Sequence, residues 1–151
     1  PVKRASSTER ASGFVAGALP MEFPVVNPKT FTSGRKPRFV YTLAFSGSGG
    51  GYFDAIQKLE AGAEMHAVRF LPPGVFPSEV EFVPRANKDA EKDAADEDAG
   101  YLLYLEYDSG SHASSVVVLD AQDITGPELA RIHLPFHVPY TFHGAFEPEY
   151  E

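Results

Sequence analysis

The sequence predicts an all-β fold, and two observations carry that prediction. Short apolar runs rich in Val, Phe, Tyr and Leu recur along the chain, and clusters of Gly, Pro and Asp separate them. This pattern is typical of consecutive antiparallel strands. The predicted strands are, in chain order, 38–45, 55–59, 63–70, 79–84, 100–107, 114–120, 129–134 and 144–146.

The turns of the C-terminal half join these strands into a meander. Residues 108–111 (Asp-Ser-Gly-Ser) have turn chemistry, so the flanking strands are expected to form a hairpin. Residues 123–127 (Asp-Ile-Thr-Gly-Pro) then turn the chain into a third strand. Such a meander is the unit of a β-propeller blade.

Three segments are expected to lie outside strands. Residues 1–13 are polar, basic and rich in Ser, and we predict a loose N-terminal segment. Residues 86–99 alternate Lys, Asp, Glu and Ala without an apolar face, which predicts a solvated loop or a frayed helical turn whose charge serves solubility. Residues 46–51 (Ser-Gly-Ser-Gly-Gly-Gly) lack the Gly-Lys-Ser/Thr of a phosphate loop, and we interpret them as a floppy hairpin loop.

Composition excludes several functions. The net charge of −8 argues against nucleic acid as a partner, because phosphate binding needs clustered Lys and Arg. The chain has no Cys, so His, Asp and Glu are the strong metal ligands available, and the compartment stays open between cytoplasm and plastid. No run approaches the length of about 18 apolar residues that a spanning helix needs. The chain begins with Pro1 rather than Met, and we expect a fragment of a longer protein.

The five histidines carry little information when each is taken alone. His133 and His137 flank a proline in an extended stretch, without the helical spacing of a chelating pair, and are expected to be structural or exposed. His112 follows Ser111 but has no nucleophile elbow or placed acid, which disfavours a hydrolase triad. His66 belongs to no recognisable motif.

A family resemblance enters at residues 138–144 (Val-Pro-Tyr-Thr-Phe-His-Gly), preceded by 116–121 (Val-Val-Val-Leu-Asp-Ala) and 130–135 (Ala-Arg-Ile-His-Leu-Pro). This succession resembles the C-terminal end of carotenoid cleavage oxygenases, a family that also holds stilbene-cleaving dioxygenases and the vertebrate retinoid isomerohydrolase. The histidine of the family motif binds iron. The resemblance therefore implies that His143 is a metal ligand.

Two upstream blocks extend the resemblance. Residues 76–85, followed by the acidic stretch 96–101, are similar to a family segment that ends in Phe-Val-Pro-Arg. Residues 21–28 (Met-Glu-Phe-Pro-Val-Val-Asn-Pro) are similar to a second one. Family members have a glutamate at each place, which implies that Glu79 and Glu22 accept hydrogen bonds from iron-bound imidazoles. The matched blocks span Glu22 to Phe146 in the family's order.

The resemblance also implies a fold and a reaction. Residues 14–151 would form the last two blades and closing strand of a seven-bladed β-propeller. The parent protein would use Fe(2+) and dioxygen to cleave a conjugated double bond in a carotenoid, apocarotenoid or stilbene-like substrate, giving aldehyde or ketone products. Neutral imidazoles suit ferrous iron, and a carboxylate on the far N–H fixes each ring's tautomer. Peripheral membrane contact would come from parts outside this chain.

The chain departs from the family pattern in two ways, and alternatives follow. Val80 and Glu81 stand where the family has Pro and an apolar residue, and strand alternation would put Glu79 and Glu81 on one face, so either could face the ring. The three further iron histidines of the family are absent, so this chain cannot complete the site. An isomerohydrolase-type reaction and a non-catalytic β module with a vestigial motif both stay open.

Overall fold

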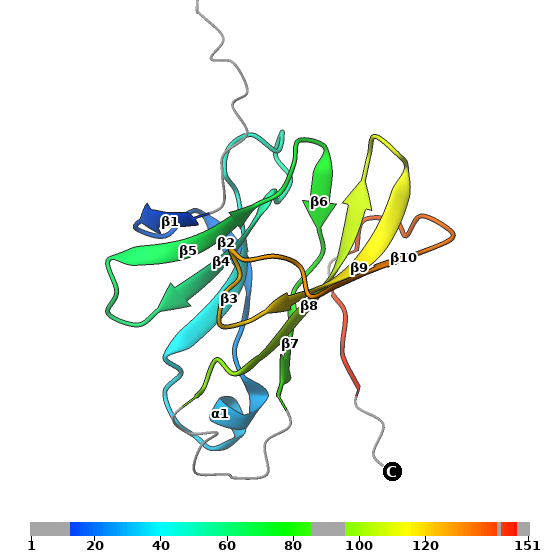
Figure 1. Ribbon diagram of the computed structural model, residues 1–151. Helices are drawn as coiled ribbons and strands as arrows, with labels where there is room; N and C mark the ends of the chain where they lie inside the picture. Colours follow the sequence, from blue (N-terminus) through cyan, green and yellow to red (C-terminus); the bar gives the residue numbers. More distant parts are fainter. Residues whose placement is uncertain (1–12, 86–95, 142, 148–151) are drawn as a thin grey trace, which may run out of the picture.

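The computed structural model describes residues 13–85, 96–141 and 143–147, and these form two antiparallel sheets (Figure 1). The first sheet has the strand order β1-β5-β4-β3-β2. Its strands are β1 (Gly13–Ala16), β2 (Met21–Val25), β3 (Phe39–Ala44), β4 (Ala55–Glu60) and β5 (Met65–Phe70). A short helix, α1 (Pro28–Thr32), connects β2 to β3; Asn27 caps it, and Pro28 opens its first turn.

The second sheet has the order β10-β9-β8-β6, with β7 also paired to β8. Its strands are β6 (Val75–Pro77), β7 (Glu81–Pro84), β8 (Gly100–Asp108), β9 (Ala113–Asp120) and β10 (Ala130–His133). The β8–β9 hairpin is the longest pairing, with registered partners from Tyr101 opposite Asp120 to Asp108 opposite Ala113. Buried and partly buried residues alternate along β8, as expected for a strand with one face on the core.

The two sheets share one apolar core. Tyr41, Leu43 and Ile56 of the first sheet belong to the same buried cluster as Leu102 and Leu119 of the second. The Tyr41 hydroxyl also donates a 3.0 Å hydrogen bond across the sheets to the carbonyl of Ala121. Burial of these side chains, at about 25 cal/mol per Å² of apolar surface, stabilises the packing of sheet on sheet.

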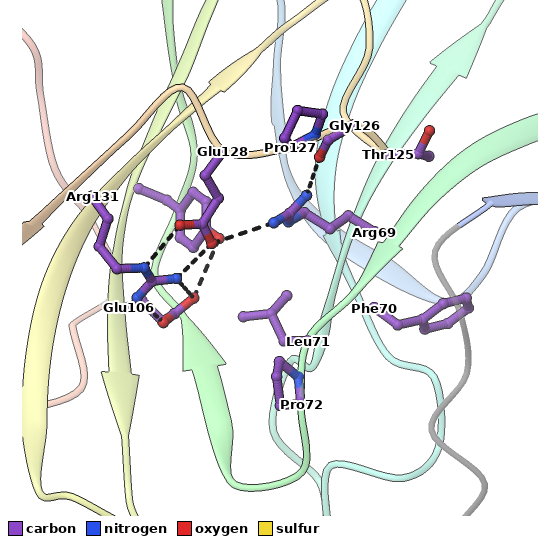
Figure 2. Close-up of a pocket in the computed structure, with 11 residues that line it drawn as sticks. Arg69, Phe70, Leu71, Pro72, Glu106, Thr125, Gly126, Pro127, Glu128 and Arg131 are labelled. Atoms are coloured by element: carbon purple, nitrogen blue, oxygen red, sulfur yellow. Dashed lines mark hydrogen bonds and ion pairs between the residues drawn. The ribbon is translucent and has the colours of Figure 1, made fainter.

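A chain of ion pairs crosses from β5 to β10 beside a cavity of about 540 Å³ (Figure 2). Arg69 of β5 contacts Glu128 at 3.3 Å and donates to the carbonyl of Gly126 at 2.9 Å. Arg131 of β10 pairs with Glu128 at 2.6 Å and with the buried Glu106 at 2.5 Å. Because each of these charged groups has an opposite partner, we interpret the network as structural.

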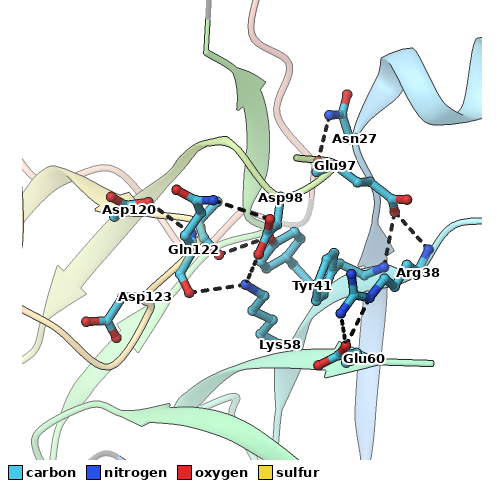
Figure 3. Close-up of polar contacts among 12 residues, drawn as sticks. Asn27, Arg38, Tyr41, Lys58, Glu60, Glu97, Asp98, Asp120, Gln122 and Asp123 are labelled. Carbon is cyan, nitrogen blue, oxygen red and sulfur yellow. Dashed lines mark hydrogen bonds and ion pairs between the residues drawn. The ribbon is translucent and has the colours of Figure 1, made fainter. Parts of the chain in front are cut away.

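A second polar cluster joins segments far apart in the sequence (Figure 3). The side chain of Asn27 accepts from the N–H of Lys29 and donates to the carbonyl of Glu97 at 2.8 Å. The Glu97 carboxylate accepts from the N–H groups of Arg38 and Phe39 at 2.8 and 3.1 Å. Thus the start of β3, the cap of α1 and the turn before β8 are held together by two residues.

The predicted all-β fold is confirmed, and most predicted strands are present. The hairpin at 108–111 and the meander β8-β9-β10 form as expected. The strands β1, β2 and β6 and helix α1 were not predicted; β6 has three residues, and β2 has five with Pro24 among them. The predicted strand at 144–146 is wrong, because these described residues form no strand and pair with none. Strand β7 begins at Glu81 rather than at Glu79.

Two predictions about loops need correction. Residues 86–95 lie outside the described part, but Glu97 and Asp98 of the same segment make specific contacts, so their charge does more than keep the surface solvated. The loop 46–51 does connect a hairpin, β3 to β4, yet it is anchored rather than floppy. The buried Asp54 accepts from the Ser46 N–H at 2.6 Å and from the Ser48 hydroxyl at 2.8 Å.

Of the predicted loose segment 1–13, residues 1–12 lie outside the described residues, and Gly13 begins β1.

Candidate metal centre

His143 lies in the irregular segment after β10, and its ring is held against Glu79. The Nδ1 atom of His143 is 3.0 Å from Oε2 of Glu79, although 64 residues separate the two in sequence. Glu79 lies in the connection between β6 and β7, and 15% of its side chain is exposed. The irregular connection between β6 and β7 therefore carries the carboxylate to the C-terminal segment.

This contact determines the tautomer of the neutral imidazole. A carboxylate accepts hydrogen bonds, so Nδ1–H of His143 donates to Glu79 and the lone pair of the neutral ring lies on Nε2. A carboxylate or carbonyl partner on the far nitrogen is the usual arrangement around metal-binding histidines. Nε2 of His143 makes no hydrogen bond to a residue within the described ranges, and 76% of the side chain is exposed. The ring thus fits one position of an imidazole metal site.

The segment that carries His143 has no regular structure, but it is fixed to both sheets. Ser114, buried in β9, accepts from the N–H of Val138 at 2.9 Å. Tyr140 packs against Tyr52 with ring centroids 5.6 Å apart, and burial raises the pKa of its hydroxyl. These contacts precede His143 by a few residues and limit where its ring can go.

An aromatic ring also contacts the imidazole. Phe23 of β2 meets His143 edge to face, with ring centroids 5.4 Å apart and planes at 75°. His143 is therefore contacted from both sheets, by Glu79 from the second and by Phe23 from the first. Phe23 was not among the predicted site residues; its neighbour Glu22 was.

The two glutamates near β7 have different surroundings. Glu79 lies before the strand, so strand alternation does not relate it to Glu81, and Glu79 is the residue that contacts His143. Burial raises the pKa of Glu81, and the nearby Glu79 carboxylate raises it further. Both effects disfavour the ionised form of Glu81, which is the form that accepts hydrogen bonds most strongly.

The other predicted site residue, Glu22, is exposed on β2 opposite Leu43. No hydrogen bond joins it to a histidine in the part of the chain that the structure describes. Its role as an acceptor thus stays a prediction that requires an imidazole from outside these residues.

The remaining histidines form no site with His143. His112 and His137 stack with centroids 4.2 Å apart near the tip of the β8–β9 hairpin, and Tyr107 bonds His112 at 2.8 Å. His133 is exposed and contacts Ser115, as its structural interpretation expects. Across the described ranges, no group of three or more His, Cys, Asp or Glu side chains is arranged to hold a metal ion.

No helix in the described part of the chain has the length and apolar character needed to span a bilayer.

Comparison with known proteins shows what these features belong to. The sequence profile of the retinal pigment epithelial membrane protein family matches residues 2–148. An apocarotenoid-15,15'-oxygenase of Synechocystis sp. is 40% identical over 126 residues, which are 83% of this chain and 24% of that protein. A carotenoid 9,10(9',10')-cleavage dioxygenase 1 of Pisum sativum is 35% identical over 154 residues, 94% of this chain and 27% of its own length.

Solved structures agree with the sequence comparison. A cobalt-substituted Synechocystis apocarotenoid oxygenase superposes with a TM-score of 0.73 at 39% identity, covering 85% of this chain and 26% of that one. The fold is therefore that of β-propeller oxygenases. The chain belongs to the family of the retinal pigment epithelial membrane protein and the carotenoid oxygenases. It spans about a quarter of the length of the relatives it matches.

Proposed function

We propose that the protein containing this chain is an iron(II)-dependent dioxygenase that cleaves a conjugated double bond in a carotenoid or apocarotenoid to aldehyde or ketone products. The proposal assigns His143 as one iron ligand and Glu79 as the carboxylate that orients it. It assigns Glu22 as the acceptor for an imidazole supplied from outside this chain. The names of the relatives favour a carotenoid or apocarotenoid over a stilbene-like substrate.

The single observation that carries the proposal is the 3.0 Å contact between His143 Nδ1 and Glu79. Among the residues that the structure describes, the ring is hydrogen-bonded through Nδ1 alone, which leaves Nε2 available as a ligand atom. A hydrogen bond to a carboxylate restrains both ring orientation and tautomer, and it raises the basicity of the free nitrogen. That combination supports metal binding over a purely structural role.

The residues of this chain contribute orientation and exclusion of water. Glu79 accepts from Nδ1–H of His143, so the lone pair of the neutral ring lies on Nε2, and Phe23 contacts the ring with apolar surface. When bound, ferrous iron would supply binding and activation of dioxygen next to the alkene. The cobalt-substituted structure of the Synechocystis relative supports a metal site in the family.

The two alternative functions receive less support. The reported relatives carry oxygenase or dioxygenase names, which favours oxidative cleavage over an isomerohydrolase reaction. A non-catalytic module with a vestigial motif would have no reason to retain the histidine–carboxylate pair together with both sheets that hold it.

The metal assignment is tested by replacing His143 in the complete gene product. His143→Ala is expected to lose stoichiometric iron and activity while the thermal unfolding midpoint stays near that of the unmodified protein. His133→Ala is the matched control, because that ring is exposed and contacts only Ser115 among the described residues. Normal iron content in His143→Ala would remove the assignment.

The reaction is tested by measuring dioxygen uptake during turnover of an apocarotenal. A cleavage dioxygenase consumes one dioxygen for each double bond that it splits, whereas isomerohydrolysis of an ester consumes none. Product formation without dioxygen uptake would favour the isomerohydrolase alternative. Loss of both in His143→Ala, with both retained in His133→Ala, would tie the reaction to this site.

A further inference from the structure

Phe23 has a backbone conformation that bulky residues rarely adopt. Its φ is +55°, in the left-handed region, and in the described part of the chain only His112 shares this among non-glycine residues. A β-carbon is disfavoured there, and such strain persists only where the surroundings impose it. It is concentrated at functional sites, so an observed outlier is a reason to ask what the strained residue does.

The cause of the strain is a bulge in β2. Glu22 lies opposite Leu43, and Val25 lies opposite Tyr41. Between these pairs β2 advances by three residues and β3 by two, so β2 contains one extra residue. Pro24 has no N–H to give to the ladder, which suits the break in register. A bulge re-aims the side chain that it carries. Here it turns the ring of Phe23 onto the imidazole of His143, 120 positions further along the chain.

Phe23 also closes a path of contacts around the histidine. Its ring meets the buried Phe53 edge to face at 5.6 Å, and Tyr52, the chain neighbour of Phe53, packs against Tyr140 with ring centroids 5.6 Å apart. Tyr140 lies three residues before His143. The histidine is thus linked to residues 52–53 twice, through the chain from Tyr140 and through the ring of Phe23.

We propose that Phe23 is a positioning residue, which sets the plane of the His143 imidazole so that Nε2 points at the metal position. The Glu79 hydrogen bond fixes the position of Nδ1 but leaves the ring free to rotate about the Nδ1···Oε2 direction. The edge-to-face contact with Phe23, at 75° between planes, restricts that rotation. The bulge and the left-handed backbone of Phe23 exist because the ring must reach the histidine.

The metal part of this inference rests on the proposed function. Two substitutions of Phe23 distinguish the effect of its aromatic ring from the effect of its strained backbone. Phe23→Leu keeps an apolar side chain and the strained backbone but removes the aromatic edge. Phe23→Gly removes the ring and adopts a φ of +55° without strain. Phe45→Leu is the control, because Phe45 stacks on the same Phe53 at 4.2 Å while no contact joins it to His143.

The first measurement is made on the iron- and cobalt-loaded gene product. Both Phe23 variants are expected to release iron to a chelator about 10-fold faster, as outer-sphere changes do elsewhere, and to shift the cobalt(II) absorption bands. Phe45→Leu is expected to lower the thermal midpoint without changing either property. If Phe23→Gly keeps the normal release rate and spectrum, or if Phe23→Leu behaves like Phe45→Leu, the proposal is overturned.

A second measurement does not depend on the metal. In the metal-free gene product, diethyl pyrocarbonate is expected to modify His143 several-fold faster in Phe23→Leu than in the unmodified protein, measured by peptide mass with His133 as internal reference. An unchanged rate would overturn the positioning role. If His143→Ala retained iron, the proposed function would fail, whereas the labelling rate would still decide whether Phe23 restrains this ring.

Discussion

Lys58 of β4 lies 2.7 Å from Asp98, at the turn before β8, and this ion pair joins the two sheets. Only 10% and 17% of the two side chains are exposed. The ammonium also lies over the rings of Phe39 and Tyr41, at 4.5 and 5.8 Å from their centroids. The pair is therefore a mostly desolvated contact between blades rather than a surface salt bridge.

Breaking this pair is expected to destabilise the protein strongly. Lys58→Met leaves the Asp98 carboxylate mostly buried without its cation, which costs about 3 kcal/mol by analogy with other buried pairs. Urea unfolding of the gene product measures the loss. The double variant Lys58→Met with Asp98→Leu should recover part of it, because no unpaired charge is then buried.

An exposed pair provides the matched control for that experiment. Arg38 contacts Glu60 at 2.5 Å, but 60% and 40% of these side chains are exposed. Arg38→Gln is expected to leave the unfolding midpoint unchanged, since exposed pairs contribute little. If Lys58→Met and Arg38→Gln changed the free energy of unfolding equally, burial of the ion pair would not determine its contribution to stability.

Replacing Glu79 is expected to reduce turnover without unfolding the protein. Glu79→Gln keeps the shape but weakens the acceptor for Nδ1–H of His143, and activity or metal affinity should fall about 10- to 100-fold. Steady-state kinetics together with iron content per chain provide the measurement. Glu81→Gln is the neighbouring control and should stay within about 2-fold of the unmodified protein, because Glu81 does not contact the ring.

The opposite result would change which carboxylate is assigned to orient His143. If Glu81→Gln lost activity while Glu79→Gln did not, the carboxylate that orients His143 in the complete protein would be the one two residues along.

Some strands of this fold are predictable from the sequence and others are not. Strands β8 and β9 have long apolar runs on either side of a clear turn signal, and in the structure buried and partly buried residues alternate over 100–107 and 115–120. The strands β2 and β6 are short and contain Pro24 and Pro77, so composition disfavours them, and only pairing with β3 and β8 stabilises them. Residues 144–146 look strand-like but pair with no strand in the described part.

The site was predictable only through family resemblance. His143 and Glu79 are 64 residues apart, and no spacing rule relates residues on a loop and an irregular segment. Alternation could not choose between Glu79 and Glu81, because the strand begins only at Glu81. The contact of Phe23 depends on a bulge. In the sequence, Pro24 indicates an irregularity in the hydrogen bonding of β2, but it does not indicate where the ring of Phe23 points.

The ion-pair network beside the cavity predicts a loss of stability in acid. Hydrogen bonding to Arg131 lowers the pKa of Glu128 below its ordinary value of 4.5. A lowered pKa in the folded state contributes stability above the unfolded value and loses it as pH falls through the folded value. Glu128→Gln should therefore be less stable than the unmodified protein at pH 7, and the difference should shrink below about pH 4.5. A difference that stays constant to about pH 3 would contradict this sign.

Glu81 should show the opposite dependence. Burial, and then the charge of Glu79, raises the pKa of Glu81, so ionising it costs folded-state stability as pH rises through the raised value. Glu81→Gln is expected to be more stable than the unmodified protein at pH 7, and this advantage should vanish in acid, where both side chains are neutral. Thermal unfolding at a series of pH values measures both variants. A Glu81→Gln variant that is less stable at pH 7 would show that the Glu81 carboxylate has a favourable partner.

Ser114 is expected to control how firmly the segment with His143 is held. Its hydroxyl is almost fully buried and accepts from the N–H of Val138, so Ser114→Ala leaves that N–H without its acceptor. A lost buried hydrogen bond costs about 1–3 kcal/mol, and amide exchange at Val138 should therefore accelerate by about 10-fold or more. The amide of Leu134 is the internal control, because it donates to the backbone carbonyl of Ser114, which the substitution keeps. Faster exchange at Val138 with unchanged exchange at Leu134 would localise the effect to the segment leading to His143. Unchanged exchange at both would mean that Tyr140 and the packing around it hold this segment without the hydroxyl.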